Sequence, residues 1–315
     1  MQAAVVNVLG EAPKYQSFPD PEVQPGEVLV KVRAAGLHQV VKAIASGAHY
    51  SSGGGLPAVP GVDGVGRLPD GRRVYFGMLR RPWGTMAEFA AAPVKMCTPV
   101  PDGLDDVRAA AIANPGMSAW VSMQRAELGI GETVLILGAT GVAGQLAIQI
   151  ARTLGAKRVI AAGRNVAAIS GSNVDAVIGL AEPEEAISEV LGKEVASGID
   201  VVIDYVWGRP AELTLEALAK GFKATATHAT RYVEVGAMAG RSITLPAEVL
   251  RAVDLTLKGS GFGAAKIDVI FAAIPKLFEQ AAAGKLTIDV DPVPLAEVES
   301  VWNRVEKGRR IVLTI

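Results

Sequence analysis

Three glycines spaced three residues apart, Gly138, Gly141 and Gly144, follow a short apolar run in the segment LGATGVAGQLAIQIA (137–151). The run is typical of a buried strand, and the residues after the glycines have helical spacing. Glycine in such a turn lets a phosphate approach the exposed N–H groups of a helix N-terminus. The pattern favours a pyrophosphate site, although Ala139 stands at the first glycine of the usual G-x-G-x-x-G fingerprint. A tight strand–helix turn without a ligand is the alternative.

The end of the next apolar segment bears on which dinucleotide is bound. An NAD site usually offers a carboxylate to the ribose hydroxyls about 20 residues past the glycines. This chain reads AAGRN there, with Gly163, Arg164 and Asn165. A guanidinium binds a 2′-phosphate through two N–H groups, so the sequence predicts NADPH rather than NADH. A solvated surface arginine is the alternative for Arg164.

Strands and helices alternate through the middle of the chain, which predicts a doubly wound parallel sheet of the Rossmann type, an α/β fold. Strands are expected at 132–137, 158–162, 175–180, 199–204, 231–236 and 254–261, and helices at 144–155, 182–196 and 211–221. Residues 223–230 lengthen the turn before the fifth strand, and His228 within them has no assigned role.

The N-terminal part has a different pattern, in which short alternating segments are separated by Gly and Pro. It predicts a mainly β domain with antiparallel pairs. The C-terminal tail contains one helical segment (266–284), a second one (295–308) and a closing strand, and it is expected to return to the first domain. The predicted domains are 1–116 with 262–315, and 117–261.

Composition and charge exclude several classes of protein. The 315 residues include 31 basic and 32 acidic side chains without a basic block, which disfavours nucleic acid as a partner. No long uncharged apolar run predicts a membrane span, and the first residues lack the pattern of a signal peptide. Cys97 is the single cysteine, which excludes an internal disulfide and a four-cysteine zinc lobe. We expect a cytoplasmic globular protein of two domains.

Six segments resemble, in order and spacing, the medium-chain dehydrogenase/reductase superfamily. They are VKVRAAGLHQV, PAVPGVDGVG, GTMAEFAAAP, NPGMSAW, VLILGATGVAG and LKGSGFG, and they extend over essentially the whole chain. The resemblance is to the zinc-independent quinone oxidoreductase branch. It implies a mainly β, GroES-like catalytic domain besides the Rossmann-type domain, and a homodimer that pairs the sixth strands.

The departures from the superfamily pattern point to chemistry without a metal. Zinc alcohol dehydrogenases of this superfamily have a Cys ligand where this chain has His38, and Gly-His-Glu where it has Gly61, Val62 and Asp63. Val62 has no metal-binding atom, so His38 and Asp63 lack a third ligand and no metal is predicted. Without a Lewis acid, the accessible reaction is hydride transfer from a nicotinamide to a quinone or an α,β-unsaturated carbonyl.

The resemblance also places the cofactor against the turns at the strand ends. The pyrophosphate contacts fall on the glycine turn, and the nicotinamide contacts fall on the turns after the fourth, fifth and sixth strands. The predicted cofactor-binding residues are Gly138, Ala139, Thr140, Gly141, Val142, Gly144, Gly163, Arg164, Asn165, Val206, Gly236, Ala237, Met238, Gly261, Phe262 and Gly263.

Tyr50, Asn114 and His38 are the candidate catalytic residues. Tyr50 lies in a glycine-rich loop, where its protonated phenol suits donation to an enolate; a surface tyrosine is the alternative. Asn114 could bind the substrate or the cofactor amide, with Pro115 and Gly116 beginning a hinge into the next helix; capping that helix is the alternative. His38 would line the pocket or be hydrogen-bonded.

The sequence therefore predicts an NADPH-dependent quinone or enone reductase, and two alternatives stay open. A 2-enoyl thioester reductase would use Tyr50 as proton donor. Its coenzyme A or carrier-protein substrate needs a basic strip, for which Lys42, Arg80 and Arg81 are the obvious candidates. A weakly catalytic NADPH-binding protein is the second alternative, and saturable NADPH consumption on any acceptor would exclude it.

The substitution Arg164→Asp tests the choice of nucleotide. It removes the cation that would bind the 2′-phosphate, so the Michaelis constant for NADPH should rise by about tenfold or more. The constant for NADH should change far less. Steady-state kinetics with both nucleotides and one acceptor measure the two effects, and equal changes would contradict the assignment.

Overall fold

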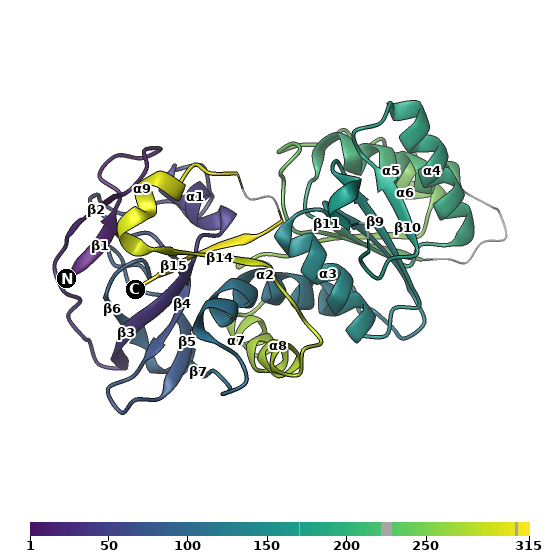
Figure 1. Ribbon diagram of the computed structural model, residues 1–315. Helices are drawn as coiled ribbons and strands as arrows, with labels where there is room; N and C mark the ends of the chain where they lie inside the picture. The colour runs from purple at the N-terminus through teal and green to yellow at the C-terminus, as the bar shows by residue number, and fades with distance from the viewer. Residues whose placement is uncertain (170, 222–228, 306–307) are drawn as a thin grey trace. The chain divides into compact units, whose positions relative to one another are not determined.

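The computed structural model describes residues 1–169, 171–221, 229–305 and 308–315 (Figure 1). The chain forms two compact units, Met1–Asn114 with Ile274–Ile315, and Pro115–Ala273. The predicted segment 223–230 falls largely outside the described residues, and His228 is among those left out.

The two boundaries lie at slightly different places from those expected. The first falls inside helix α2 (Asp106–Arg125), and the second lies after Ala273 rather than after residue 261. Arg125 explains why the segment after residue 261 stays with the second unit. Its guanidinium donates to the carbonyl oxygens of Gly259 at 2.8 Å and Ala264 at 2.5 Å.

The second unit is built on a six-stranded sheet in which every pair is parallel. Its strands are β8 Thr133–Leu137, β9 Arg158–Gly163, β10 Ala176–Gly179, β11 Val201–Asp204, β12 Thr230–Glu234 and β13 Leu255–Gly259. The spatial order β10-β9-β8-β11-β12-β13 is the dinucleotide-binding order, with its switch point between β8 and β11. The predicted Rossmann-type sheet is confirmed.

Helices cover both faces of this sheet, which explains why its central strands are apolar throughout. The helices are α3 Val142–Thr153, α4 Glu184–Ser197, α5 Gly208–Lys220 and α6 Val249–Ala252. On one face, Ile187 and Leu191 of α4 belong to the same buried cluster as Leu135 of β8. Helix α3 lies on the other side of the sheet from α4 and α5 (Figure 1).

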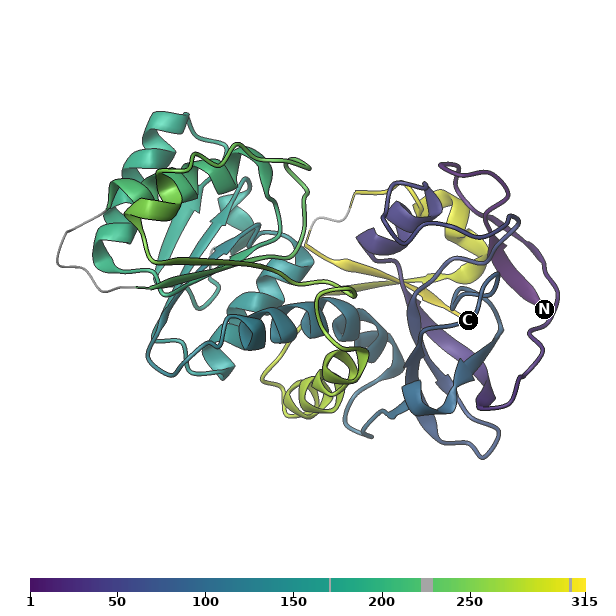
Figure 2. The same ribbon diagram turned by 180° about the vertical axis from the view of Figure 1, so that it is seen from behind.

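The first unit is mainly antiparallel β-structure, as predicted. Its larger sheet has the order β14-β15-β3-β4-β5-β7, with β6 also paired to β3, and only the β14–β15 pair is parallel. The elements are β1 Gln2–Val5, β2 Lys14–Ser17, β3 Glu27–Gly36, α1 Gln39–Ala45, β4 Asp63–Arg67, β5 Arg73–Gly77, β6 Phe89–Pro93, β7 Thr98–Pro99, β14 Val290–Pro294, α9 Val298–Val301 and β15 Arg310–Thr314. Because β15 pairs with β3, both chain ends lie in this unit (Figure 2).

The single helix expected at 266–284 is interrupted. It forms α7 (Ile267–Phe271) and α8 (Ala273–Ala282). Pro275 gives the reason, because proline lacks an N–H and its ring clashes with the carbonyl four residues earlier in a continuous helix. In the observed arrangement Pro275 falls in the first turn of α8, where proline is tolerated.

Candidate functional site

The glycine turn connects β8 to α3 at the switch point of the sheet. Gly138 has a φ of +86°, and a Cβ added there would lie 2.9 Å from Val206 Cγ1. Ala139 is fully buried and is not among the residues with a positive φ. The positive φ that favours glycine is therefore found at Gly138 and not at Ala139. This explains why alanine is accepted at the first fingerprint position.

The other two glycines have separate physical roles. A Cβ on Gly144 would lie 2.3 Å from the carbonyl oxygen of Gly138, so glycine is needed where α3 packs on the turn. Gly141 is the N-cap of α3, has extended backbone, and receives no side-chain cap. A Cβ there would meet only Gly138 O, at 3.5 Å. The N-terminus of α3 therefore presents accessible N–H groups, which fits a pyrophosphate.

The end of β9 supports the expected ribose side of the site. A Cβ on Gly163 would lie 2.4 Å from Thr140 Cγ2, so this glycine lets the two turns pack together. Arg164 and Asn165 follow it and are exposed. Within the described part of the chain Arg164 forms no ion pair, which leaves its guanidinium available to an anion.

A buried carboxylate that the sequence analysis missed holds the turn after β11. Asp204 is fully buried, and its Oδ1 accepts hydrogen bonds from the backbone N–H groups of Val206 at 2.7 Å and Trp207 at 2.9 Å. Its Oδ2 accepts one from the Tyr232 hydroxyl at 2.7 Å. Burial raises the pKa of Asp204, and these hydrogen bonds oppose the shift. The carboxylate that ends the apolar run VVID (201–204) was the available signal.

The later turns are also close to this carboxylate. The backbone N–H groups of Val235 and Gly236 donate to the carbonyl oxygen of Asp204 at 2.7 and 3.2 Å. A Cβ on Gly236 would lie 3.1 Å from Tyr205 O, so glycine allows a close backbone contact between the two turns. Other predicted cofactor-binding residues lie at the surface of this unit. The exposed ones are Ala237, Met238, Gly261, Phe262 and Gly263.

His38 lies inside the first unit in a buried polar cluster. It is 1% exposed, and its Nε2 is 3.0 Å from Oδ1 of Asp63, which is 3% exposed. The Tyr75 hydroxyl donates to Asp63 Oδ2 at 2.8 Å, and the Thr85 hydroxyl donates to the Asp63 carbonyl at 2.7 Å. Among the described residues, no group of three or more His, Cys, Asp or Glu side chains could hold a metal ion.

Tyr50 lies in the turn after α1, with 74% of its surface exposed. Its ring is 4.1 Å from that of His49. The guanidinium of Arg81 donates to the carbonyl oxygens of Ser51 and Gly53, so the backbone of this loop is held although the Tyr50 ring is exposed.

The expectation of a helix beginning at Asn114 is wrong. Helix α2 starts at Asp106 and continues through Asn114 with Pro115 inside it, so Asn114 does not cap the helix. Asp105 supplies the cap instead, since its Oδ1 accepts the N–H of Arg108 at 2.8 Å. Asn114 is half-buried on this helix.

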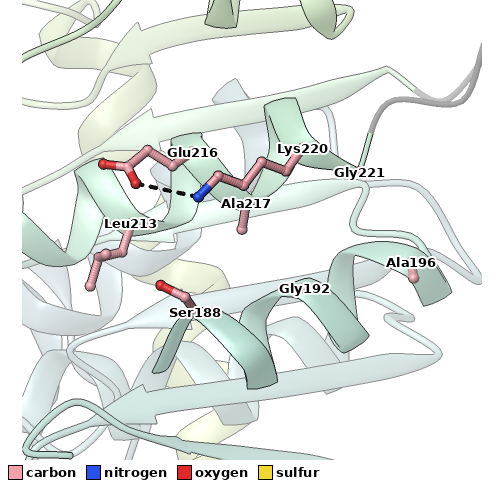
Figure 3. Close-up of a pocket in the computed structure, with 8 residues that line it drawn as sticks. All are labelled: Ser188, Gly192, Ala196, Leu213, Glu216, Ala217, Lys220 and Gly221. Atoms are coloured by element: carbon pink, nitrogen blue, oxygen red, sulfur yellow. Dashed lines mark ion pairs between the residues drawn. The ribbon is translucent and has the colours of Figure 1, made fainter. Parts of the chain in front are cut away.

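A groove of about 310 Å³ lies between α4 and α5, away from these residues (Figure 3). Its lining includes Gly192, Ala196 and Ala217, and the ion pair of Lys220 with Glu216 spans 3.9 Å beside them. It contains none of the predicted site residues.

No helix in the described ranges is both long enough and apolar enough to span a bilayer.

Comparisons with known proteins agree with this architecture. No protein-family model matches the chain. It is 28% identical to "Probable NADPH-dependent quinone reductase tdiC" of Emericella nidulans over 99% of both chains. It is 25% identical to an alcohol dehydrogenase of Geobacillus stearothermophilus, over 100% of this chain and 99% of the relative. The solved quinone oxidoreductase of Thermus thermophilus, also described in complex with NADPH, matches over 100% of both chains with a TM-score of 0.81 and 27% identity.

The chain belongs to the medium-chain dehydrogenase/reductase superfamily. This confirms the resemblance inferred from the six segments. For this superfamily member, the predicted cofactor residues all lie in the second unit, and the candidate catalytic residues Tyr50, Asn114 and His38 all lie in the first. Their individual roles stay predictions.

The raised pKa of Asp204 predicts a pH dependence of stability. The folded state holds the Asp204 proton more tightly than the unfolded state, so ionisation lowers the free energy of unfolding as pH rises above the ordinary Asp value of about 3.9. Asp204→Asn accepts the same backbone hydrogen bonds but cannot ionise. The difference in Tm, variant minus wild type, should therefore increase from pH 3.5 toward neutral.

Asp70→Asn is the matched control. Hydrogen bonds from Arg72 lower the pKa of this exposed carboxyl, so its substitution should give a difference in Tm that does not increase with pH. Thermal melts of the three proteins across the acid range test the prediction. A flat or falling difference for Asp204→Asn would contradict it.

Proposed function

We propose that this protein is a cytoplasmic, NADPH-dependent reductase that transfers hydride, without a metal, to a quinone or an α,β-unsaturated carbonyl. The observation that carries the proposal is the uncapped N-terminus of α3 next to the exposed Arg164 at the end of β9. The pyrophosphate is common to the dinucleotides and the 2′-phosphate distinguishes NADPH from NADH, and each of these anions has a fitting group here.

The residues of the second unit would bind and orient the cofactor. The N–H group of Val142, the first residue of α3, would hold the pyrophosphate, because the N–H of Gly141 already donates to the carbonyl of Gly138 at 3.1 Å. Arg164 would hold the 2′-phosphate. Val206, fixed by Asp204, lies beside the nicotinamide half together with the turns at Gly236–Met238 and Gly261–Gly263. When bound, NADPH supplies the hydride from its nicotinamide ring. Two of the relatives named above are described as NADPH-dependent or in complex with NADPH, which supports this choice.

In the first unit, Tyr50 and Asn114 would serve the acceptor. The phenol of Tyr50 and the amide of Asn114 are neutral hydrogen-bond donors, which suits stabilisation of the enolate or hydroquinone oxygen as charge develops. His38 is too deeply buried to touch an acceptor and would act as a positioning residue through Asp63.

The basic side chains considered for a thioester substrate have other partners. Arg81 binds loop carbonyls, as described above. Arg80 donates to the carbonyl of Glu22 at 2.9 Å and stacks 4.9 Å from the Trp83 ring centre. Lys42 donates to the carbonyl of Arg304 at 3.4 Å. These contacts favour a small uncharged acceptor over the phosphates of coenzyme A or a carrier protein.

A panel of acceptors tests the proposed reaction. Oxidation of NADPH should be fastest with 1,4-benzoquinone, 9,10-phenanthrenequinone or a 2-alkenal, slower with crotonyl-coenzyme A, and unaffected by a chelator. Oxidation of an aliphatic alcohol with NADP⁺ should be negligible, because no Lewis acid polarises it. Crotonyl-coenzyme A as the best acceptor would favour the enoyl thioester reductase, and chelator-sensitive alcohol oxidation would contradict the metal-free reaction.

The free edge of the second unit's sheet supports a homodimer. Strand β13 pairs only with β12 among the described strands, and its Leu257 is 39% exposed. An unpaired edge is a template for a second copy. Sedimentation should give twice the chain mass of 32.7 kDa. Leu257→Asp should shift the protein toward monomer, and a wild-type monomer at all micromolar concentrations would contradict the dimer.

A further inference from the structure

Trp207 has a backbone conformation that residues with a side chain rarely adopt. It directly follows Val206, where β11 leads into α5, and its φ of +53° and ψ of −156° lie close to a region that is almost exclusive to glycine. Its N–H donates to Oδ1 of Asp204 at 2.9 Å, which fixes the turn. The next residue is itself a closely packed glycine, because a Cβ on Gly208 would lie 2.9 Å from the carbonyl oxygen of Ala239. A large side chain kept in a strained turn calls for an explanation.

The indole of Trp207 is only partly buried. Its ring centre lies 6.2 Å from that of Tyr232, and the two ring planes are inclined at 73°. Its Nε1 has no hydrogen-bond partner in the described part of the chain, and this atom is not enclosed by the protein. Packing on Tyr232 therefore accounts for only part of the ring. The rest of the indole, including its N–H, is accessible to a ligand.

The position of Trp207 in the sheet points to a dinucleotide as that ligand. Strand β11 borders the switch point, and ligands of such sheets bind outside the carboxyl ends of the strands there. Arg164 follows β9, and only β8 lies between β9 and β11, a separation of about 10 Å. The adenine and the 2′-phosphate of NADPH are attached to the same ribose. With the 2′-phosphate at Arg164, the adenine comes within reach of Trp207.

The residue after Gly208 ties this turn to the same side of the sheet. The guanidinium of Arg209 donates to both carboxylate oxygens of Glu184, at 3.0 and 2.8 Å, a geometry that fixes direction. Glu184 begins α4, which follows β10, the neighbour of β9. On the other side, a Cβ on Gly138 would lie 2.9 Å from Val206 Cγ1, so Val206 lies toward the glycine turn. The two neighbouring residues can therefore contact different halves of one cofactor.

We propose that Trp207 is a cofactor-binding residue, whose indole stacks on the adenine ring of NADPH. The inference rests on the proposed function, because it takes NADPH as the dinucleotide bound at the switch point. Stacking between a base and an aromatic side chain is favourable and needs a large flat ring. This gain on binding offsets a backbone strain that glycine at position 207 would avoid.

Calorimetric titration of Trp207→Leu and Trp207→Phe tests the inference. The ligands are NADPH and adenosine 2′,5′-bisphosphate, which share the adenine and the 2′-phosphate, whereas only NADPH has a nicotinamide. Leucine keeps an apolar contact with Tyr232 but has no aromatic ring, so the Kd of both ligands should rise by the same factor, about fivefold or more. Phenylalanine keeps a flat ring and should retain most of the affinity. If the leucine variant does not fold, Trp207→Gly gives the same test, because glycine fits this backbone.

Trp83→Leu is the matched control, since Trp83 is a half-buried tryptophan of the first unit. It should leave both affinities unchanged. Unchanged affinities of Trp207→Leu would overturn the inference. Weakening of NADPH alone would also overturn it, because the ring would then contact the nicotinamide half, and so would equal weakening by leucine and phenylalanine, which indicates a structural role. Failure of the wild type to bind either ligand would instead overturn the proposed function, and the inference with it.

Discussion

The carboxylate of Asp204 is the interaction on which the candidate cofactor site depends. It is fully buried, and burial of a carboxyl group without partners would be strongly unfavourable. Its side chain instead accepts hydrogen bonds from two backbone N–H groups of its own turn and from the Tyr232 hydroxyl of β12. Its backbone carbonyl accepts two more, from the N–H groups that follow the end of β12. One residue thereby aligns the ends of β11 and β12. These are the strand ends where the nicotinamide half is expected.

Close packing of glycines provides the second constraint. Gly138, Gly144 and Gly163 each lie so near another residue that a side chain would collide with backbone, with Thr140 or with Val206. They bring β8, α3 and the end of β9 together and leave the first turn of α3 uncapped. The departure at Ala139 is accepted for the same reason. Positive φ is needed at Gly138, and Ala139 only has to be small and buried.

The first unit contains a buried polar cluster to which we assign no metal. His38, Asp63, Tyr75 and Thr85 hold one another in a nearly water-free position. A Cβ on Gly36 would lie 2.4 Å from His38 Nε2, so the histidine ring occupies space that only glycine at position 36 leaves open. In the proposed reaction the acceptor would contact neutral groups such as Tyr50 and Asn114, which suits an already activated acceptor.

Local pattern determined the order of strands and helices in the second unit, the glycine turn and the exposed Arg164. Each depends on residues close together in the chain, such as apolar periodicity or the absence of a side chain. Contacts between distant residues could not be predicted in this way. Asp105 as the cap of α2 and Pro275 as the break in the last long helix are local signals that the sequence analysis did not use. The tertiary structure alone decided that the Asp204 carboxylate meets the Tyr232 hydroxyl. The physical reason is that such partners are set by which strand ends the fold brings together.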